Sequence, residues 1–427
     1  MTSAEATETY PPKAEQITRT HWLILISAFM GWMFDSMDLN LFTLVLFPSV
    51  RELLGVSDPK VIAQTGSLIM AIKLLCWGIG GIIFGVVADR IGRSKTMVIT
   101  ILIYAGFTGL SGLAQTWWQL AILQALAGFG IGGEWAAGAA LIAETWPEKQ
   151  RARAMQIMQM AFAFGFFLAA LDNLIFGPIG GWRLVLFIGA LPAIVALGVR
   201  RFVPEPERWL QVRSETLSQS PTQTFLGIFK QGLGRRTFVG VVISSSMMLG
   251  CWGGLTLLPS WINQMLGPQA ATQGVAMVSY AFMLMMAGAI LGYLSLIWTT
   301  EALGRRISYF IFMLGSLISS LYLFEQVKTV EAVLWFMPVY GYFVIGGFGT
   351  FAAYLPELFP TRVRATGQGF CWNFARCITA LGPLIAGSLI GVMGSIPAAA
   401  AVTCWLFVPG LFVIWMGPET RGKPLED

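Results

Sequence analysis

The chain has 427 residues, of which 56% are hydrophobic and 11% are charged, and its mean hydropathy is +0.70. Soluble domains carry about 25% charged residues, so this composition excludes a soluble protein and indicates a membrane protein with many spans. The net charge of +5 does not indicate nucleic-acid binding, because the basic residues lie in short loops between apolar segments.

Twelve apolar segments follow one another along the chain, each long enough to cross a lipid bilayer. They span residues 22–47, 62–87, 95–114, 117–143, 152–175, 181–201, 237–263, 275–298, 305–325, 332–355, 365–391 and 395–417. The sixth and seventh are separated by the longest hydrophilic stretch. We therefore predict an all-α membrane protein with an N-terminal six-helix bundle (1–203), a cytoplasmic linker (204–236) and a C-terminal six-helix bundle (237–427).

Basic residues are distributed unequally between the two sides of the predicted membrane. With the N-terminus inside, the outer loops hold only Arg51, Lys60, Lys328 and, at a helix edge, Arg183. The inner loops collect Arg90, Arg93, Lys95, Lys149, Arg151, Arg153, Arg200, Arg201, Arg305, Arg306, Arg362 and Arg364. This asymmetry predicts a plasma-membrane protein, as in a bacterial inner membrane, with both termini in the cytoplasm.

The two halves of the chain repeat each other. The stretch AETWPEKQRARA (143–154) is echoed half a chain later by PELFPTRVRATG (356–367), so that Glu144 corresponds to Glu357 and Arg151 to Arg364. DRIGR (89–93) is likewise echoed by EALGR (301–305), and PEPERW (204–209) by PETRGK (418–423). The repeat predicts two pseudo-symmetric bundles of the same topology.

The first apolar segment carries two carboxylates, Asp35 and Asp38, near its middle. An acid at that depth costs roughly 2.5–3.5 kcal/mol, so two of them indicate a function. A spacing of three residues puts both on one helix face. Two like charges so close cannot both stay ionised easily in a poor solvent, which predicts that one holds a proton. We assign the proton to Asp35 with Asp38 as its partner, and the reverse assignment stays open.

Three more ionisable residues, Lys73, Glu134 and Arg376, lie at a similar depth in other segments. Transporters built from internal repeats place substrate and coupling-ion sites at this level. Arg376 is predicted to bind a substrate carboxylate with two hydrogen bonds, the alternative being a structural pair that closes a gate. Lys73 either binds the same anion or pairs with one of the aspartates. Glu134 is either a second proton carrier or an acid fixed by Lys73.

Neighbours of Arg376 extend the candidate substrate site. Trp372 and Asn373 lie about one helical turn before it, and Asn373 shares its face and can hydrogen-bond a substrate. Tyr354, near the inner end of the tenth segment, is a lesser candidate. Asp172 lies near the outer end of the fifth segment and is expected at the membrane interface.

Several motifs together resemble the major facilitator superfamily over essentially the whole chain. GVVADRIGRSK (85–95) is similar to the loop signature GxLxDRxGRR, and PEPERWL and PETRGKPLE are similar to the PESPRW and PETKG signatures. FDSMDL (34–39) looks like the DGxD motif of aromatic-acid:proton symporters, with Ser36 in place of glycine. GFGIGGEW (128–135) looks like the fourth span of sialate and related metabolite:proton symporters. Gln124, also a candidate substrate-binding residue, stands where many relatives carry an arginine.

The resemblance also implies a gate on the cytoplasmic side. The acid equivalent to Asp89 meets the N-terminus of the eleventh helix in this family, where the helix dipole favours a carboxylate. Arg90 and Arg93 are expected to pair with acids such as Glu144. The remaining gating candidates are Arg151, Glu301, Arg305, Glu357 and Arg364.

These patterns predict a monomeric, proton-coupled symporter that imports a small organic acid, aromatic or sugar-acid in type, by alternating access. The alternatives are a sugar or zwitterion symporter, a drug/proton antiporter, or a sensor without flux. We expect no cofactor besides the proton and no enzyme activity, because no nucleophile or cofactor motif occurs. The five cysteines show neither metal-site nor disulfide spacing, so no metal is expected.

Overall fold

The computed structural model describes residues 17–230 and 232–426. Within them the chain forms α-helices and short 3-10 turns, and no strand occurs in that part of the chain. The first half comprises α1 (Arg19–Leu54), α2 (Pro59–Ile91), α3 (Arg93–Ser111), α4 (Trp117–Thr145), α5 (Glu148–Ala190) and α6 (Pro192–Arg200). Residues 1–16 of the predicted N-terminal bundle lie outside the described residues.

The second half follows a linker that contains α7 (Glu207–Ser218) and α8 (Pro221–Gly227). It comprises α9 (Leu233–Leu266), α10 (Ala270–Leu303), α11 (Arg305–Gln326), α12 (Val330–Val344), α13 (Gly349–Tyr354), α14 (Arg364–Thr379), α15 (Gly382–Met393), α16 (Ile396–Cys404) and α17 (Val408–Val413). Helix α9 thus begins before residue 237, where the second bundle was predicted to start.

Ten helical stretches in the described residues are individually long and apolar enough to cross a membrane. One of them, α5, contains the fifth predicted segment and the first half of the sixth, which continues as α6. The two segments are separated at Gly180 and Gly181, which leave the helical conformation, with φ of −136° and +63°. The second value lies in the left-handed region that glycine adopts without steric cost. The eleventh segment was predicted as one helix over 365–391 but is two helices, α14 and α15. When the sixth and eleventh segments are counted as one crossing each, in addition to the ten stretches, the twelve-helix prediction is confirmed.

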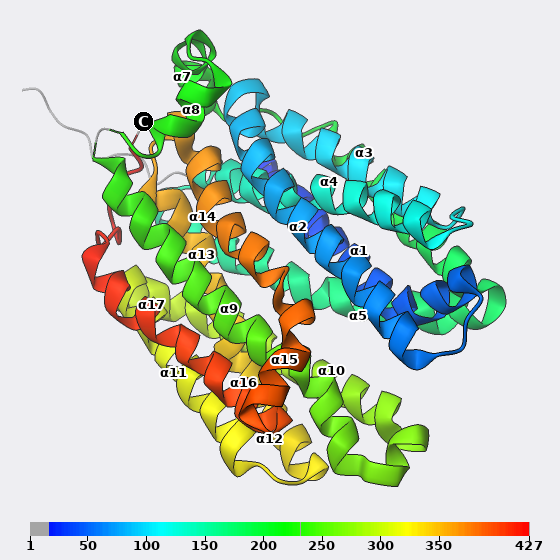
Figure 1. Cartoon of the computed structure of the whole chain (residues 1–427). Helices are drawn as coiled ribbons and strands as arrows, with labels where there is room; N and C mark the ends of the chain where they lie inside the picture. The colour runs from blue at the N-terminus through cyan, green and yellow to red at the C-terminus, as the bar shows by residue number, and fades with distance from the viewer. Residues whose placement is uncertain (1–16, 231, 427) are drawn as a thin grey trace, which may run out of the picture.

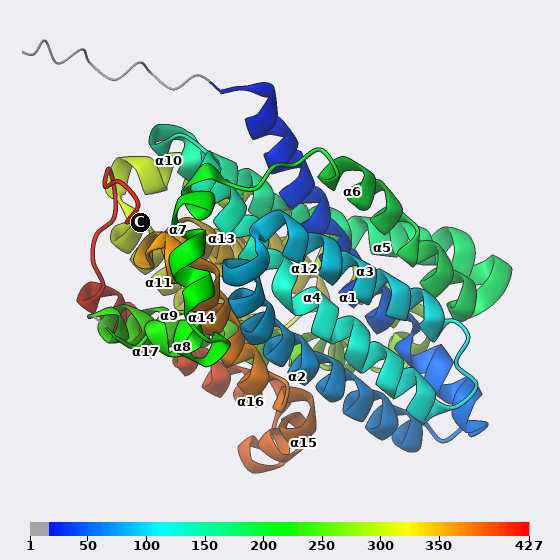
Figure 2. The same ribbon diagram turned by 90° about the horizontal axis from the view of Figure 1, so that it is seen from above.

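The two halves lie side by side as separate bundles (Figure 1). Helix α2 packs against α14 and α5 packs against α10, so these two pairs join the bundles. The linker helices α7 and α8 lie at one end of the molecule, beside the ends of α2 and α14 (Figure 2). His21, at the start of α1, contacts the Thr145 carbonyl, and Thr361 donates to the Glu426 carbonyl. Both described chain ends therefore lie on this side, hereafter the linker side.

Glycines allow α2 and α14 to approach closely. A Cβ atom on Gly81 would overlap the Asn373 side chain, and one on Gly85 would overlap the Ala365 carbonyl oxygen. These positions lie four residues apart, on one face of α2, as in other small-residue helix contacts within membranes. The close contact brings Trp77 on α2 opposite Arg376 on α14.

The sequence repeat corresponds to a repeated helix cap. In the first half the Glu205 carboxylate accepts backbone N–H groups at the start of α3, including that of Arg93 at 2.7 Å. In the second half Glu419 accepts those of Arg305 at 3.0 Å and Arg306 at 3.1 Å, at the start of α11. Each carboxylate thus satisfies free N–H groups of a helix that begins on the linker side.

Candidate functional site

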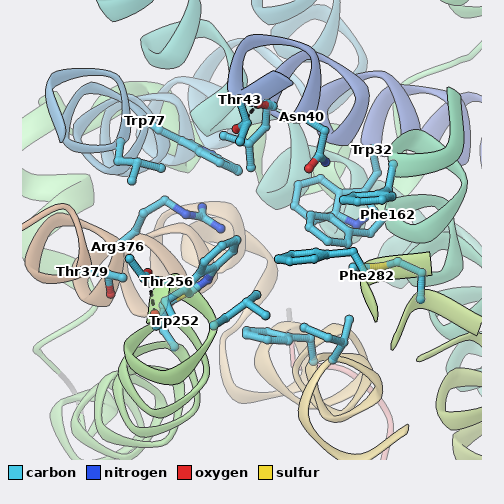
Figure 3. Close-up of a pocket in the computed structure, with 18 of the residues that line it drawn as sticks. Trp32, Asn40, Thr43, Trp77, Phe162, Trp252, Thr256, Phe282, Arg376 and Thr379 are labelled. Atoms are coloured by element: carbon cyan, nitrogen blue, oxygen red, sulfur yellow. Dashed lines mark hydrogen bonds between the residues drawn. The ribbon is translucent and has the colours of Figure 1, made fainter. Parts of the chain in front are cut away.

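A cavity of about 300 Å³ lies between the two halves (Figure 3). Helices α1, α2 and α5 line it from the first half, and α9, α10, α14 and the turn before α13 line it from the second. Its walls are largely apolar and include several aromatic side chains, with Trp32, Trp77 and Phe162 on one half and Trp252, Phe282 and Trp372 on the other. Neither half forms the cavity alone.

Arg376 is the one charged side chain among the described residues that line this cavity. Its guanidinium group lies over the Trp77 ring, 3.8 Å from the ring centroid, and it also donates to Asn373 Oδ1 at 2.8 Å. Asn373 in turn donates to the Gly369 carbonyl at 2.9 Å. Asn373 therefore orients Arg376, while Trp372 lines the cavity one turn earlier on α14. A buried guanidinium group with remaining N–H donors can bind a carboxylate.

A second polar cluster lies inside the first half, outside the lining of the cavity. Lys73 Nζ is 2.8 Å from Asp38 Oδ2 and donates to Gln124 Oε1, also at 2.8 Å. Thr108 donates to the other oxygen of Asp38, and Gln124 donates to Ser111 at 3.0 Å. Lys73 was predicted either to bind the substrate anion or to pair with an aspartate. In the structure it pairs with an aspartate.

Asp35 is fully buried one helical turn before Asp38. It lies outside the cavity lining and interacts electrostatically with Lys73 of the first half and with Arg376 of the second. The two aspartates on one helix face thus have different surroundings.

Glu134 and Tyr354 also lie outside the cavity lining. Glu134 is buried on α4 and accepts a hydrogen bond from Thr100 at 2.7 Å. Tyr354 donates to the Pro418 carbonyl at 2.8 Å, near the linker side. Asp172 is buried, and it too lies outside the lining.

The contact expected for Asp89 is present. Its carboxylate accepts the backbone N–H groups of Ala365 at 3.2 Å and Thr366 at 2.7 Å, at the start of α14. The Thr366 hydroxyl adds a third bond at 2.6 Å. A carboxylate of the first half thus caps a helix of the second, where free N–H groups and the helix dipole favour it.

Ion pairs join the two halves on the linker side. Glu144 lies between two buried guanidinium groups, that of Arg93 at 2.8 Å and that of Arg364 at 2.9 Å. Arg151 and Arg305 both approach Glu357, at 3.8 Å and 2.8 Å.

Two further arginines of the first half make contacts on this side. Arg153 makes two 3.0 Å bonds to Glu301. Arg90 instead donates to the carbonyl groups of Thr216 and Gln219 at the end of α7. The pairing with Glu144 expected for Arg90 is therefore corrected, because its position directly after Asp89 turns it toward the linker.

Sequence reasoning missed the aromatic partners of the site. Neither Trp77 nor Trp32 was among the predicted site residues. A usable signal existed, because Trp77 follows Lys73 by four residues and Trp32 precedes Asp35 by three, which places each near the face of a buried charge.

Residues 22–370 match the family model of the Major Facilitator Superfamily. The chain belongs to the major facilitator superfamily. It is therefore a multi-pass membrane transporter and not an enzyme. A protein of Haemophilus influenzae named for metabolite transport is 31% identical, over 95% of this chain and 98% of its own length. The cis,cis-muconate transport protein of Acinetobacter baylyi is 27% identical, over 93% and 95%.

A solved structure supports the same fold. The proton:xylose symporter XylE superposes on this superfamily member with a TM-score of 0.78, at 18% identity, over 95% of this chain and 98% of the other. At that identity the similarity concerns the fold alone.

Proposed function

We propose that the protein is a proton-coupled symporter that imports a small organic acid across the plasma membrane by alternating access. The observation that carries the proposal is Arg376, the one cation among the described residues that line a cavity enclosed by both halves. An anion is the natural partner for this cation, because a desolvated carboxylate requires a charge-assisted partner. The cis,cis-muconate transported by the Acinetobacter relative is such an acid.

Asp35 is the proposed proton carrier. Asp38 already has Lys73 as its partner at 2.8 Å, whereas Asp35 interacts with the cation that would hold the substrate. When a substrate carboxylate occupies Arg376, it competes with the Asp35 carboxylate for the same positive charge. Protonation of Asp35 removes that competition, which gives a physical route to coupling between proton and anion. Glu134 remains the second proposed proton carrier.

The linker-side contacts are the proposed gate. They close the side that we assign to the cytoplasm, so release of the substrate requires the Asp89 and Glu144 contacts to break. We propose that the protein works as a monomer with both termini in the cytoplasm. A neutral-sugar symporter is less favoured, because a neutral substrate would leave the Arg376 charge without a partner in the cavity.

The test is uptake of labelled benzoate and nicotinate into proteoliposomes under an inward proton gradient. Asp35→Asn should abolish accumulation against a gradient while exchange of substrate across the membrane survives. Arg376→Ala should weaken binding of the acids about tenfold to a hundredfold, as expected for loss of a charge-assisted hydrogen bond. Binding of a neutral amide analogue should stay unchanged.

Matched controls exist for both variants. Asp172→Asn removes a buried acid outside the cavity lining. Arg183→Ala removes an arginine that also lies over a tryptophan ring, that of Trp182 at 4.1 Å, away from the cavity. Both controls should retain uptake. Full uphill uptake by Asp35→Asn, or acid binding independent of Arg376, would contradict the proposal.

A further inference from the structure

The indole N–H group of Trp32 lacks a hydrogen-bond acceptor. Trp32 lies on α1, is 3% exposed and lines the cavity, yet its Nε1 atom bonds to nothing in the described part of the chain. Buried donors are nearly always paired, because an unpaired one loses its bond to water without replacement. An unpaired donor at the wall of a cavity indicates that the acceptor belongs to whatever fills the cavity.

A neighbouring tryptophan shows that the local packing does allow such a bond. The Trp135 ring lies 6.5 Å from that of Trp32, and its N–H donates to Gln159 at 3.0 Å. Trp372 stacks on the Trp135 ring at 4.2 Å, lines the cavity, and has an unpaired buried N–H like that of Trp32. The residues that line this one cavity therefore carry two unpaired indole donors and one guanidinium group.

These donors come from different parts of the cavity. Trp372 lies on the same helix as Arg376, with the guanidinium 5.8 Å from its ring. Trp32 lies on the other half, and Figure 3 shows it with Asn40 on the side opposite Arg376. The cavity thus has a cationic end and a second end with neutral polar groups. The side chains of Leu39, Phe162 and Phe282 also line it and are apolar.

We propose that Trp32 is a specificity-determining residue whose indole N–H binds an uncharged acceptor on the substrate. The substrate is then a flat aromatic or unsaturated monocarboxylate, with its carboxylate at Arg376 and Trp372. A hydroxyl, carbonyl or ring nitrogen at its far end lies at Trp32. This inference rests on the proposed function and specifies its substrate class.

The far acceptor is uncharged because no second cation lines the cavity among the described residues. A second ionised carboxylate there would be desolvated without a counter-charge, which is costly. The volume of about 300 Å³ lies at the lower end of the range of about 300–1,000 Å³ found for ligand pockets. It suits a molecule with a single ring.

The experiment compares binding of acids that differ only at the far end. Benzoate is paired with 3-hydroxybenzoate, 4-hydroxybenzoate and nicotinate, and each affinity is measured by calorimetry on purified protein. We expect wild-type protein to bind at least one acceptor-bearing acid about five- to tenfold more tightly than benzoate, as a neutral hydrogen bond would give. Trp32→Phe keeps an aromatic ring but removes the N–H group. It should lower the affinity for that acid to the affinity for benzoate.

Two measurements separate this role from a structural one. Trp32→Phe should remove the preference for the acceptor-bearing acid over benzoate, and an unfolding temperature close to that of wild type shows that the variant is folded. Trp146→Phe removes another buried, unpaired indole N–H that lies outside the cavity lining, and it should change no affinity. Equal wild-type affinity for all four acids, or an equal loss for all of them in Trp32→Phe, overturns the inference but leaves carboxylate binding at Arg376 intact. Absence of any Arg376-dependent acid binding overturns both.

Discussion

Asp35 and Asp38 show how strongly surroundings differ between residues one helical turn apart. Asp38 shares a dense network with Lys73, Thr108 and, through Lys73, Gln124. Asp35 interacts across the boundary between the halves with Arg376. We therefore propose that Asp35 responds to the substrate and that Asp38 stabilises its own bundle.

The Asp38–Lys73 pair predicts a stability effect with a specific rescue. Removing one partner of a buried ion pair leaves an uncompensated charge and costs about 3–5 kcal/mol, whereas removing both is often nearly neutral. Asp38→Asn should therefore lower the thermal unfolding temperature in detergent, and the double variant Asp38→Asn, Lys73→Met should recover most of the loss. Asp35→Asn serves as the comparison and should change the unfolding temperature less. An Asp38→Asn protein as stable as wild type would refute the prediction.

Depth along a helix could be predicted from the sequence, but rotation about the helix axis could not. Counting residues placed Asp35, Lys73 and Arg376 near one level of the membrane. Helices such as α4 are apolar on nearly all faces, so the sequence contained no polar stripe to indicate the direction in which Glu134 points. The choice between the two roles of Lys73 likewise depended on the rotation of α2 about its own axis. Long-range packing, not local pattern, determined it.

At the scale of helices and turns, both halves share the same feature, a carboxylate that caps the start of a helix. Each comes from the segment that follows the last crossing of its half and returns to an earlier helix, α3 for Glu205 and α11 for Glu419. Gly92 and Gly304, directly before those helices, have φ of +118° and +89°. A side chain at either glycine would also crowd the capping carboxylate.

The Glu419 cap predicts a pH-dependent contribution to stability. Burial alone would raise the pKa of this carboxyl, but N–H groups of Arg305, Arg306, Arg421 and Thr420 outweigh it and hold the pKa below its ordinary value of 4.5. A carboxyl whose pKa is lower in the folded state stabilises the fold above its ordinary pKa, and this contribution disappears as pH falls through the lowered value. Glu419→Gln should unfold at a lower temperature than wild type at pH 7.

The difference between Glu419→Gln and wild type should shrink as the pH falls below about 4.5, measured by thermal unfolding across a pH series. Glu331→Gln, at the first turn of α12, provides a carboxyl outside this cap. A gap between Glu419→Gln and wild type that stays constant down to pH 3 would show that the charge of Glu419 is not what stabilises the cap.

Hydropathy predicted where the helices lie along the sequence, but it did not predict where a helix is interrupted. All twelve apolar segments correspond to helices, but the eleventh breaks after Thr379. The sequence there, Ala-Leu-Gly-Pro, ends in Pro383, which has no N–H to donate back to the preceding turn. Arg376 thus lies in the last turn of α14, where its charge is favoured by the negative end of the helix dipole.

For the whole molecule, the linker side holds the two halves together through charges buried at their boundary. Glu144 neutralises Arg93 of its own half and Arg364 of the other. Glu144→Gln leaves the buried Arg364 without its acid, while Arg93 keeps Asp89 at 3.0 Å, so the closed arrangement should weaken by about 3 kcal/mol. Hydrogen exchange of backbone amides in residues 361–368 should rise accordingly, measured by mass spectrometry.

Arg153→Ala is the matched control for this effect. Its pair with Glu301 also joins the halves, but the arginine side chain is 52% exposed, and exposed pairs contribute only about 0–1 kcal/mol. Exchange in residues 361–368 should barely change. Equal exchange in Glu144→Gln and wild type would show that other contacts, such as the Asp89 cap, suffice to close this side.

The interaction of Asp35 with Arg376 has a consequence for how uptake is energised. In the proposed cycle the unloaded carrier returns with Asp35 negatively charged and Arg376 positively charged, so that the two charges compensate each other. The loaded carrier crosses with the arginine balanced by the bound anion and the aspartate neutral. These groups then move no net charge in either direction. Accumulation of a monovalent acid would accordingly follow the difference in pH across the bilayer and be indifferent to its voltage.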